Sequence, residues 1–171
     1  MAKVKLFIGL ITAKSVDKHL LENKISQLFG KIECRSDEFD FSHTTYYKNE
    51  MGNNLKKIFL VINPLISEFE SYLEKIKAVK LENEFMVNNK RTVNIDPGTL
   101  SAHNVILLTT KNYAHRIPLN QNIYAELTYT FKDKNYSVLP WSYPDFGTSN
   151  YLSFFEDQRM NYLKQLRGRN D

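Results

Sequence analysis

The chain has 171 residues, a length typical of one domain of roughly 100 to 200 residues. Hydrophobic residues make up 42% of it and charged residues 25%, which excludes a disordered chain and indicates a globular protein with a buried core. The formal net charge is +4, but acidic residues lie among the basic ones. A nucleic-acid partner is therefore possible on charge but is not favoured by it.

The cellular compartment is predicted from one cysteine and the first residues of the chain. Cys34 is the sole cysteine, so no intramolecular disulfide can form and a reducing cytoplasm is expected. Lys3 and Lys5 precede an apolar run over residues 6–13 that resembles a short secretory signal. Ile11 fits a small-residue cleavage site poorly, and we favour a buried strand. No run approaches the roughly 18 apolar residues of a membrane span, so no membrane partner is predicted.

The first part of the chain predicts a strand, a helix and a second strand. Apolar residues over about 4–11 predict a buried first strand. Ser15 is expected to cap a helix that has apolar residues at helical spacing and ends at Gly30. The segment "KIECRSDEFDF", residues 31–41, alternates between apolar and polar side chains, as a half-buried strand does.

A third strand and a second helix are expected next. The segment "LKKIFLVI", residues 55–62, predicts the strand. Pro64 and a capping box from Ser67 to Glu70 predict the start of the helix. Its core-facing stripe is expected to hold Phe69, Leu73 and Ile76, with Lys80 at the edge.

The segment "RTVNIDPGTL", residues 91–100, predicts a fourth strand that runs into a tight turn at Asp96-Pro97-Gly98. The resulting order β-α-β-β-α-β is that of ferredoxin-like domains. An antiparallel meander and a last helix over about 150–166 are expected to follow, the meander strands lying over residues 104–110, 115–119, 123–131 and 136–140. The prediction is a single α+β domain over residues 1–171, with a ferredoxin-like start, an antiparallel meander and a C-terminal helix.

Common catalytic and cofactor motifs are absent from the sequence. Gly30-Lys31 is followed by Ile32, so the G-x-x-x-x-G-K-[ST] phosphate loop is missing. There is no G-x-G-x-x-G, G-x-S-x-G or H-E-x-x-H, and one cysteine cannot form a C-x-x-C zinc site. The sequence therefore assigns no cofactor, no metal and no oligomeric state, and it leaves open whether the protein is an enzyme.

Asn94 and Asp96 form the first candidate cluster, because residues two apart on a strand share one face. Asp96 could act as a general base or a metal ligand at a strand end. The structural alternative is turn chemistry, in which Pro97 fixes φ and Gly98 takes the positive φ of a type II turn. Both interpretations remain open on the sequence.

A second cluster combines a turn with one acidic residue in the meander. Lys111 and Arg116 could hold a phosphate or carboxylate, and His115 could move a proton near neutral pH. The alternative is a solvated hairpin. Glu126 is the one charged residue in "IYAELTYTF", so it needs a partner if its face is covered and is an ordinary outward residue if it is not. We predict that Asn94, Asp96, His115 and Glu126 face one cavity.

Two aromatic segments complete the candidate set. In "HTTYYKNEMG", His43, Tyr46, Tyr47 and Glu50 would share one side of a helix, either as a substrate lid or as a flap over the core. In "LPWSYPDF", Trp141 and Tyr143 could stack a base or sugar, although such rings more often close one end of a sheet.

Six segments in one order carry a family resemblance: "KLFIG", "YYKNEMG", "RTVNIDPG", "TKNYAHR", "IYAE" and "WSYPDF". In these segments, which span nearly the whole chain, the sequence resembles the uncharacterised prokaryotic domain-of-unknown-function family DUF4416. The resemblance implies no activity. Some relatives carry a GTP-binding label, which the missing phosphate loop gives no reason to transfer.

Two function classes follow from these clusters. The favoured class is a cytoplasmic small-ligand-binding domain or enzyme acting on an anionic, phosphorylated compound. The alternative is an RNA- or protein-binding module that uses an aromatic sheet face without catalysis. In the favoured class the catalytic residues would be Asp96, His115 and Glu126, and the ligand-binding residues Asn94, Lys111, Arg116, Tyr47, Glu50, Trp141 and Tyr143.

Overall fold

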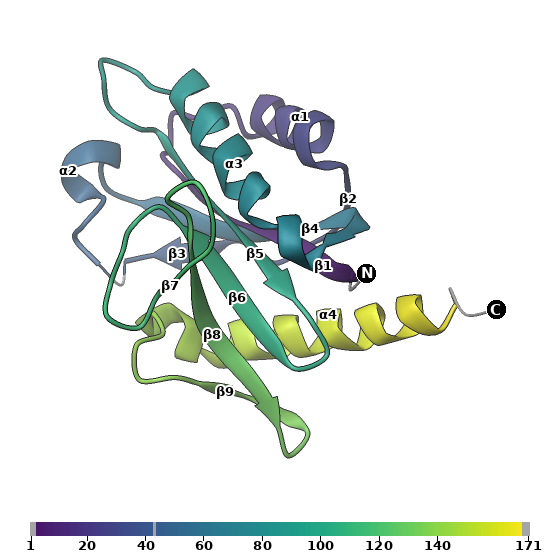
Figure 1. Ribbon diagram of the computed structural model, residues 1–171. Helices are drawn as coiled ribbons and strands as arrows, with labels where there is room; N and C mark the ends of the chain where they lie inside the picture. The colour runs from purple at the N-terminus through teal and green to yellow at the C-terminus, as the bar shows by residue number, and fades with distance from the viewer. Residues whose placement is uncertain (1–2, 43, 169–171) are drawn as a thin grey trace.

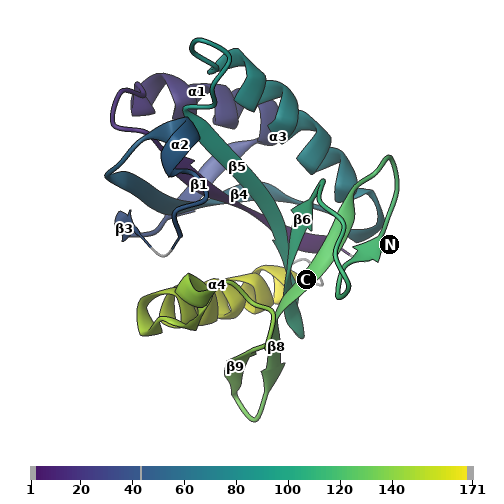
Figure 2. The same ribbon diagram turned by 90° about the vertical axis from the view of Figure 1, so that its left-hand side faces the viewer.

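The computed structural model describes residues 3–42 and 44–168, which form one antiparallel sheet with helices on both faces (Figures 1 and 2). The strands are β1 (Lys3–Thr12), β2 (Lys31–Arg35), β3 (Phe39–Phe41), β4 (Leu55–Ser67), β5 (Val93–Leu100), β6 (Asn104–Thr109), β7 (Ile117–Pro118), β8 (Tyr124–Lys132) and β9 (Asn135–Val138). The four α-helices are α1 (Lys18–Phe29), α2 (Lys48–Met51), α3 (Tyr72–Glu84) and α4 (Ser149–Arg167). Two short 3-10 helices are η1 (Glu68–Glu70) and η2 (Pro144–Gly147).

The sheet order is β2-β4-β1-β5-β6-β8-β7, with β3 beside β4 and β9 beside β8. This arrangement confirms the α+β prediction. β1 lies between β4 and β5, and its residues after Lys3 are buried, as the apolar run predicts. Its side chains alternate, so that Leu6 and Ile8 enter one core and Phe7 enters the other.

Helices α1 and α3 cover the first face of the sheet (Figure 2). The N-cap of α1 is Asp17, whose carboxylate accepts from the amide of Leu20, so the expectation of Ser15 at this position was wrong. Gly30 ends α1 with a φ of 121°, as predicted. A side chain is strained at that φ, which favours glycine.

Helix α3 begins later than expected, and the residues that it buries differ from the predicted ones. Pro64 lies inside β4, which continues to Ser67, and the Ser67 hydroxyl makes no capping bond. Phe69 precedes the helix and is 73% exposed, and Leu73 is also exposed. The buried positions of α3 are two apolar and three charged residues, namely Ala78, Leu81, Glu74, Lys75 and Glu82. The predicted stripe was therefore wrong.

Helix α4 covers the second face of the sheet (Figures 1 and 2). It forms over Ser149–Arg167, close to the predicted bounds, and buries Phe155 and Tyr162 against the strands. The Phe155 ring lies 4.9 Å from that of Phe7 and 5.0 Å from that of Phe59, both in edge-on contact. The aromatic core beneath α4 is thus continuous from β1 to β4.

The Asp96-Pro97-Gly98 segment is not a turn. It pairs along its length with β1, Asp96 opposite Gly9 and Gly98 opposite Phe7, so the predicted type II turn was wrong. Gly98 is required by packing and not by a positive φ. A Cβ there would lie 2.3 Å from Cζ of Phe7 and 2.6 Å from the carbonyl oxygen of Ile106.

β5 and β6 separate partway along their length. They pair only from Gly98 opposite Leu107 to Leu100 opposite Val105, while β5 extends back to Val93. The edge of β5 that β6 leaves unpaired is met by α3. The Glu82 carboxylate accepts from the amide of Ile95 at 2.6 Å, and the Lys75 ammonium donates to the Ile95 carbonyl at 2.8 Å. Two buried charges thus satisfy the backbone groups that β6 leaves unpaired.

The predicted meander is only partly formed: the strands are antiparallel, but β6 pairs with β8 and not with β7, and β7 and β9 both pair with β8. The β7–β8 and β8–β9 hairpins are closed by short turns. Positive φ values at Gln121 and Asn122, and again at Asp133 and Lys134, mark the two turns. A register shift in the β6–β8 pairing places a bulge near Thr128. Among the described residues, no helix is long and apolar enough to cross a membrane.

Candidate functional site

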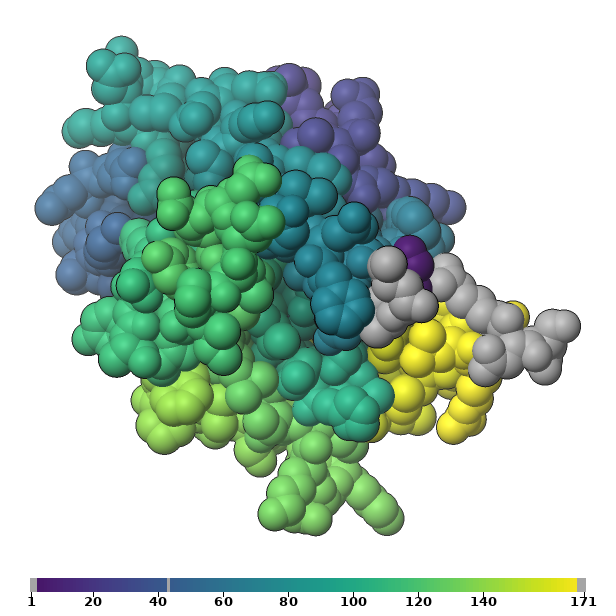
Figure 3. Space-filling view, viewed as in Figure 1, coloured from purple at the N-terminus to yellow at the C-terminus, as the bar shows by residue number. Residues whose placement is uncertain are grey.

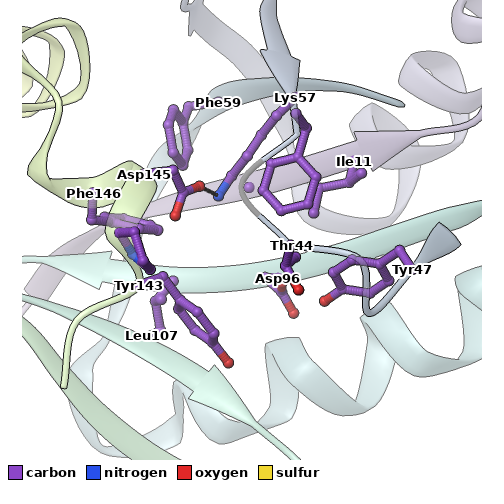
Figure 4. A pocket seen from close by; sticks show the side chains of 13 residues that line it. Ile11, Thr44, Tyr47, Lys57, Phe59, Asp96, Leu107, Tyr143, Asp145 and Phe146 are labelled. Carbon is purple, nitrogen blue, oxygen red and sulfur yellow. Dashed lines mark hydrogen bonds and ion pairs between the residues drawn. The ribbon is translucent and has the colours of Figure 1, made fainter. Parts of the chain in front are cut away.

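A cavity of about 60 Å³ lies on the α4 side of the sheet, next to the point where β5 and β6 separate (Figure 4). Its floor includes Gly9 and Ile11 of β1. Its walls carry ionisable and hydroxyl groups together with aromatic rings, namely Lys57, Asp96, Asp145, Tyr47, Tyr143, Phe41, Phe59 and Phe146. The walls come from distant parts of the chain, so the cavity is a product of tertiary folding.

Asp96 is the carboxylate on the β5 wall. Its Oδ1 accepts from the Lys75 ammonium at 3.0 Å, and its Oδ2 accepts from the Asn94 side-chain amide at 2.6 Å. The side chain is surrounded by protein yet 38% exposed, because it borders the cavity. Burial acts to raise the pKa of Asp96, but Lys75, Lys57 and Asn94 together hold that pKa below its ordinary value. The carboxylate is therefore ionised at neutral pH and is a better acceptor than general base.

Asn94 connects Asp96 to the α2 segment. Its side-chain oxygen accepts from Nη1 of Arg91 at 3.1 Å. Arg91 also forms a two-pronged pair with Glu50 of α2, Nε to Oε1 and Nη2 to Oε2, each at 2.8 Å. Hydrogen bonds from Arg91 lower the pKa of Glu50. This chain of contacts fixes α2 against the start of β5.

Lys57 and Asp145 form a buried ion pair on the opposite wall (Figure 4). The ammonium donates to Oδ2 of Asp145 at 2.5 Å, with both side chains less than 10% exposed. The Lys57 ammonium also lies 4.7 Å from the ring centre of Phe146 and 5.3 Å from those of Phe59 and Tyr151. Aromatic rings and a carboxylate thus stabilise one positive charge at the cavity wall.

A second cavity, of about 30 Å³, shares Asp96, Leu107 and Tyr143 with the first. It is also lined by Glu126 of β8, which is 2% exposed. Oε2 of Glu126 accepts from Nε of Arg116 at 2.7 Å and lies 2.9 Å from Nε2 of His115. Among the described residues, Oε1 of Glu126 has no hydrogen-bond partner. A buried carboxylate oxygen without a donor is costly, so the second cavity calls for a donor from outside the protein chain.

Tyr143 lies between the two cavities. Its hydroxyl accepts from Nη2 of Arg116 at 3.2 Å, which leaves the tyrosine proton available to a further acceptor. Burial raises the pKa of Tyr143, so the hydroxyl keeps this proton at neutral pH. Burial and the charge of Asp96 likewise raise the pKa of Tyr47. Both hydroxyls are neutral donors on the cavity walls.

The mouth of the site is aromatic and carries one further cation. Trp141 stacks on His115 with ring centres 5.2 Å apart, and its indole nitrogen donates to the Leu127 carbonyl. The Lys111 ammonium donates to the Tyr46 hydroxyl and lies 4.1 Å from the centre of that ring. Figure 3 shows the corresponding surface, where the blue segment around α2 meets the green segment before β7.

The structure places the sequence-predicted residues in three connected groups. Asp96, Arg116, Glu126 and Tyr143 line the second cavity, and Tyr47 lines the first. Asn94 and His115 line neither cavity but contact Asp96 and Glu126, so the prediction of one shared cavity holds for Asp96 and Glu126 alone. Glu50 lines a separate groove beside α2, and Lys111 and Trp141 form the aromatic contacts with Tyr46 and His115. Their functional roles remain predictions. His43 lies outside the described residues.

Three charged residues at the site were missed from the sequence: Lys57, Lys75 and Asp145. Lys57 had a readable signal, because strand alternation places it on the face of Leu55 and Phe59, where a lysine is unexpected. Lys75 and Asp145 gave no comparable signal, since each is recognised only by the group it meets in the fold.

The acidic and histidine side chains do not gather into a metal centre. Among the described residues, no group of three or more His, Cys, Asp or Glu side chains is arranged to hold a metal ion. Each of the site's carboxylates is instead paired with a lysine or arginine. The arrangement is suited to hydrogen bonding with a polar ligand.

Comparisons with known proteins agree with the resemblance drawn from the six segments. No curated protein and no solved structure matches the chain. A family model described as "Domain of unknown function (DUF4416)" matches residues 2–162. The chain therefore belongs to the DUF4416 family of domains of unknown function.

Proposed function

We propose that this protein is a small-ligand-binding domain whose site is the pair of connected cavities on the α4 side of the sheet. One observation carries the proposal: Glu126 presents a buried, unpartnered carboxylate oxygen at a cavity that Asp96 and Tyr143 also line. Ligand sites are concave, mostly apolar and contain a few convergent polar groups. The aromatic walls and the ionised side chains of these cavities fit that description.

The ligand we propose is anionic and phosphorylated, with its charged group at the mouth. Among the described residues, Lys111 has a hydroxyl partner but no carboxylate within ion-pair distance. Arg116, which the sequence offered for the same purpose, is already paired with Glu126. A phosphate would therefore meet Lys111 first, and the uncharged part of the ligand would lie against Trp141 and Tyr143.

Catalysis is a further part of the proposal, with His115 as its best-placed residue. His115 is held by Glu126 on one nitrogen and by Trp141 on one ring face. That arrangement orients an imidazole for proton transfer. Asp96 fits an acceptor role better, because its pKa is lowered. Activity toward a phosphorylated compound would have to disappear in His115→Gln while binding remained.

We further infer a cytoplasmic, single-domain protein with a ferredoxin-like first half. The order β2-β4-β1-β5, with α1 and α3 on one face, supports the ferredoxin-like topology. The lone Cys34 supports a reducing compartment. The RNA-binding alternative has weaker support, because α4 covers the aromatic face of the sheet on which bases would have to stack.

The test is a thermal-shift screen of nucleotides, sugar phosphates and divalent metals against the wild type, Asp96→Asn and Glu84→Gln. Glu84 is the control, since it pairs with Lys24 on the far side of the sheet. A ligand at about 100 times its Kd adds about 2.7 kcal/mol, or roughly 5–11 °C at this chain length. We expect the shift in the wild type and Glu84→Gln and its loss in Asp96→Asn. Equal shifts in all three would contradict the proposed site, and binding to RNA that weakens steeply with salt would favour the alternative.

A further inference from the structure

The cavity between β5 and β8 has the size and polarity of a subsite for one chemical group. Its volume of about 30 Å³ exceeds the roughly 10–15 Å³ that a single water needs and is far below that of a whole ligand. The polar groups at it are Asp96, Arg116, Glu126, Tyr143 and Thr109. The subsite can therefore hold one terminal group of a larger molecule.

The hydrogen-bonding groups around this cavity specify both a donor and an acceptor. Oε1 of Glu126 has no donor among the described residues, while its Oε2 is held by Arg116 and His115. The Tyr143 hydroxyl accepts from Arg116 and has its own proton free. An incoming group must thus donate to Glu126 and can accept from Tyr143.

Charge balance separates a hydroxyl from an ammonium group. Glu126 and Asp96 are already matched by Arg116 at 2.7 Å and Lys75 at 3.0 Å. An ammonium would add an unmatched positive charge beside the Arg116 guanidinium, and it could not accept from Tyr143. A hydroxyl adds no charge and both donates and accepts.

We propose that the cavity lined by Glu126 and Tyr143 is a hydroxyl subsite, so that the ligand is a phosphorylated alcohol of the sugar or polyol class. This inference rests on the proposed function and adds the group that the ligand presents to Glu126. The mouth, where Trp141 and Lys111 lie, would receive the rest of the molecule. Glu126 would then determine specificity and not merely hold Arg116.

Three short probes with the same three-carbon chain differ only in what the terminal carbon carries: hydroxypropyl phosphate, propyl phosphate and aminopropyl phosphate. Their Kd values can be measured by titration of ¹H–¹⁵N spectra, following the amides of Leu107 and Glu126, which face each other across β6 and β8. A hydrogen bond to a charged acceptor predicts that the hydroxyl probe binds about tenfold more tightly than the propyl probe. The aminopropyl probe should gain nothing over the propyl probe.

Glu126→Gln converts the free acceptor into a donor without changing its shape. The Arg116 Nε–H holds the side-chain oxygen on its own side, so the amide nitrogen of the glutamine takes the place of Oε1. The hydroxyl can then only accept from a neutral amide, so we expect its advantage to fall well below tenfold. Glu82→Gln is the matched control, because Glu82 is also buried but comes from α3 and accepts from the amide of Ile95 without lining the second cavity. Tyr143→Phe, at a half-exposed side chain, should reduce the advantage even if Glu126→Gln does not fold.

The possible outcomes distinguish a failure of the hydroxyl subsite from a failure of the proposed ligand-binding function. The hydroxyl subsite is contradicted if the hydroxyl and propyl probes bind with equal affinity, or if the aminopropyl probe binds most tightly. Either result would still support a binding site for phosphorylated compounds. An undiminished tenfold hydroxyl advantage in Glu126→Gln would also overturn the hydroxyl subsite. If none of the three probes shifts any amide near the cavity, the proposed function fails together with the inference.

Discussion

Gly98→Ala should destabilise the protein strongly, because β5 packs too closely at that position for any side chain. The new Cβ would lie 2.3 Å from Cζ of Phe7 and 2.6 Å from the carbonyl oxygen of Ile106. The carbonyl belongs to β6, which is paired with β5 there, so it cannot move without breaking the ladder. The Phe7 ring is held by Phe59 and Phe155 in edge-on contact.

The expected loss lies at the upper end of the overpacking range, about 3 kcal/mol, or roughly 6–12 °C in Tm for a chain of this length. Gly9→Ala is the control in the neighbouring strand. Its Cβ would meet Phe59 at 3.4 Å and the Asp96 carbonyl at 3.5 Å, which are ordinary contacts, so we expect a loss below about 1 kcal/mol. Urea unfolding followed by far-UV circular dichroism gives both values.

A double-mutant cycle tests the cause of the Gly98 effect. If the clash with Phe7 is responsible, Phe7→Leu should cost less stability in the Gly98→Ala background than in the wild type. A turn glycine with positive φ would lose about 1–2 kcal/mol on substitution whatever stands at position 7. Additive effects would exclude the Phe7 clash as the cause and leave only the Ile106 carbonyl, and a Gly98→Ala loss no larger than that of Gly9→Ala would refute the packing argument.

Three further predictions concern the charges around the cavity. The pKa of Glu50 is lowered by its arginine partner, so Glu50 stabilises the fold above its unfolded pKa of about 4.3 and loses this effect as pH falls through its folded pKa. Glu50→Gln should cost about 1 kcal/mol at pH 7, and urea titrations should show this cost shrinking as pH falls below the unfolded pKa. Lys57→Met leaves Asp145 buried and unpaired and should cost about 3 kcal/mol or more, much of it recovered by adding Asp145→Asn, as Tm will show. Lys111→Ala should raise the lowered pKa of Tyr46, which an NMR titration of the tyrosine ring measures.

The elements that the sequence predicted well are those set by local chemistry. The apolar run at residues 4–11 became β1 because a central strand is buried on both faces. Gly30 ended α1 because its φ of 121° strains any side chain. The β7–β8 and β8–β9 hairpins formed between predicted strands, with positive φ at the Gln, Asn, Asp and Lys residues of their turns.

The errors arose where tertiary contacts outweigh local preference. Asp-Pro-Gly is strong turn chemistry, yet β1 pairs with all three residues and Phe7 fills the space above Gly98. Helix α3 could not be oriented from apolar spacing alone, because it directs Lys75 and Glu82 inward to an edge of β5 that the sequence does not reveal.

The candidate site was only partly visible in the sequence for the same reason. Asp96 and Glu126 stood out as single acidic residues on predicted strands, and the structure brings both to one cavity. Their lysine and arginine partners are separated from them by 21 and 10 positions. Such pairing has no local signature, whereas Lys57 on an apolar strand face did have one.

The separation of β5 and β6 is the feature that connects the fold to the proposed function. If β6 stayed paired with β5 back to Val93, the sheet would gain ladder hydrogen bonds, and neither Lys75 nor Glu82 would have to be buried to satisfy Ile95. Burying charged side chains such as these carries a desolvation cost that apolar residues of equal volume would not have. Features that cost stability in this way concentrate at functional sites, where they place side chains in position to bind a ligand. The unpaired stretch of β5 is also where Asp96 borders both cavities, which is why we place the binding site there.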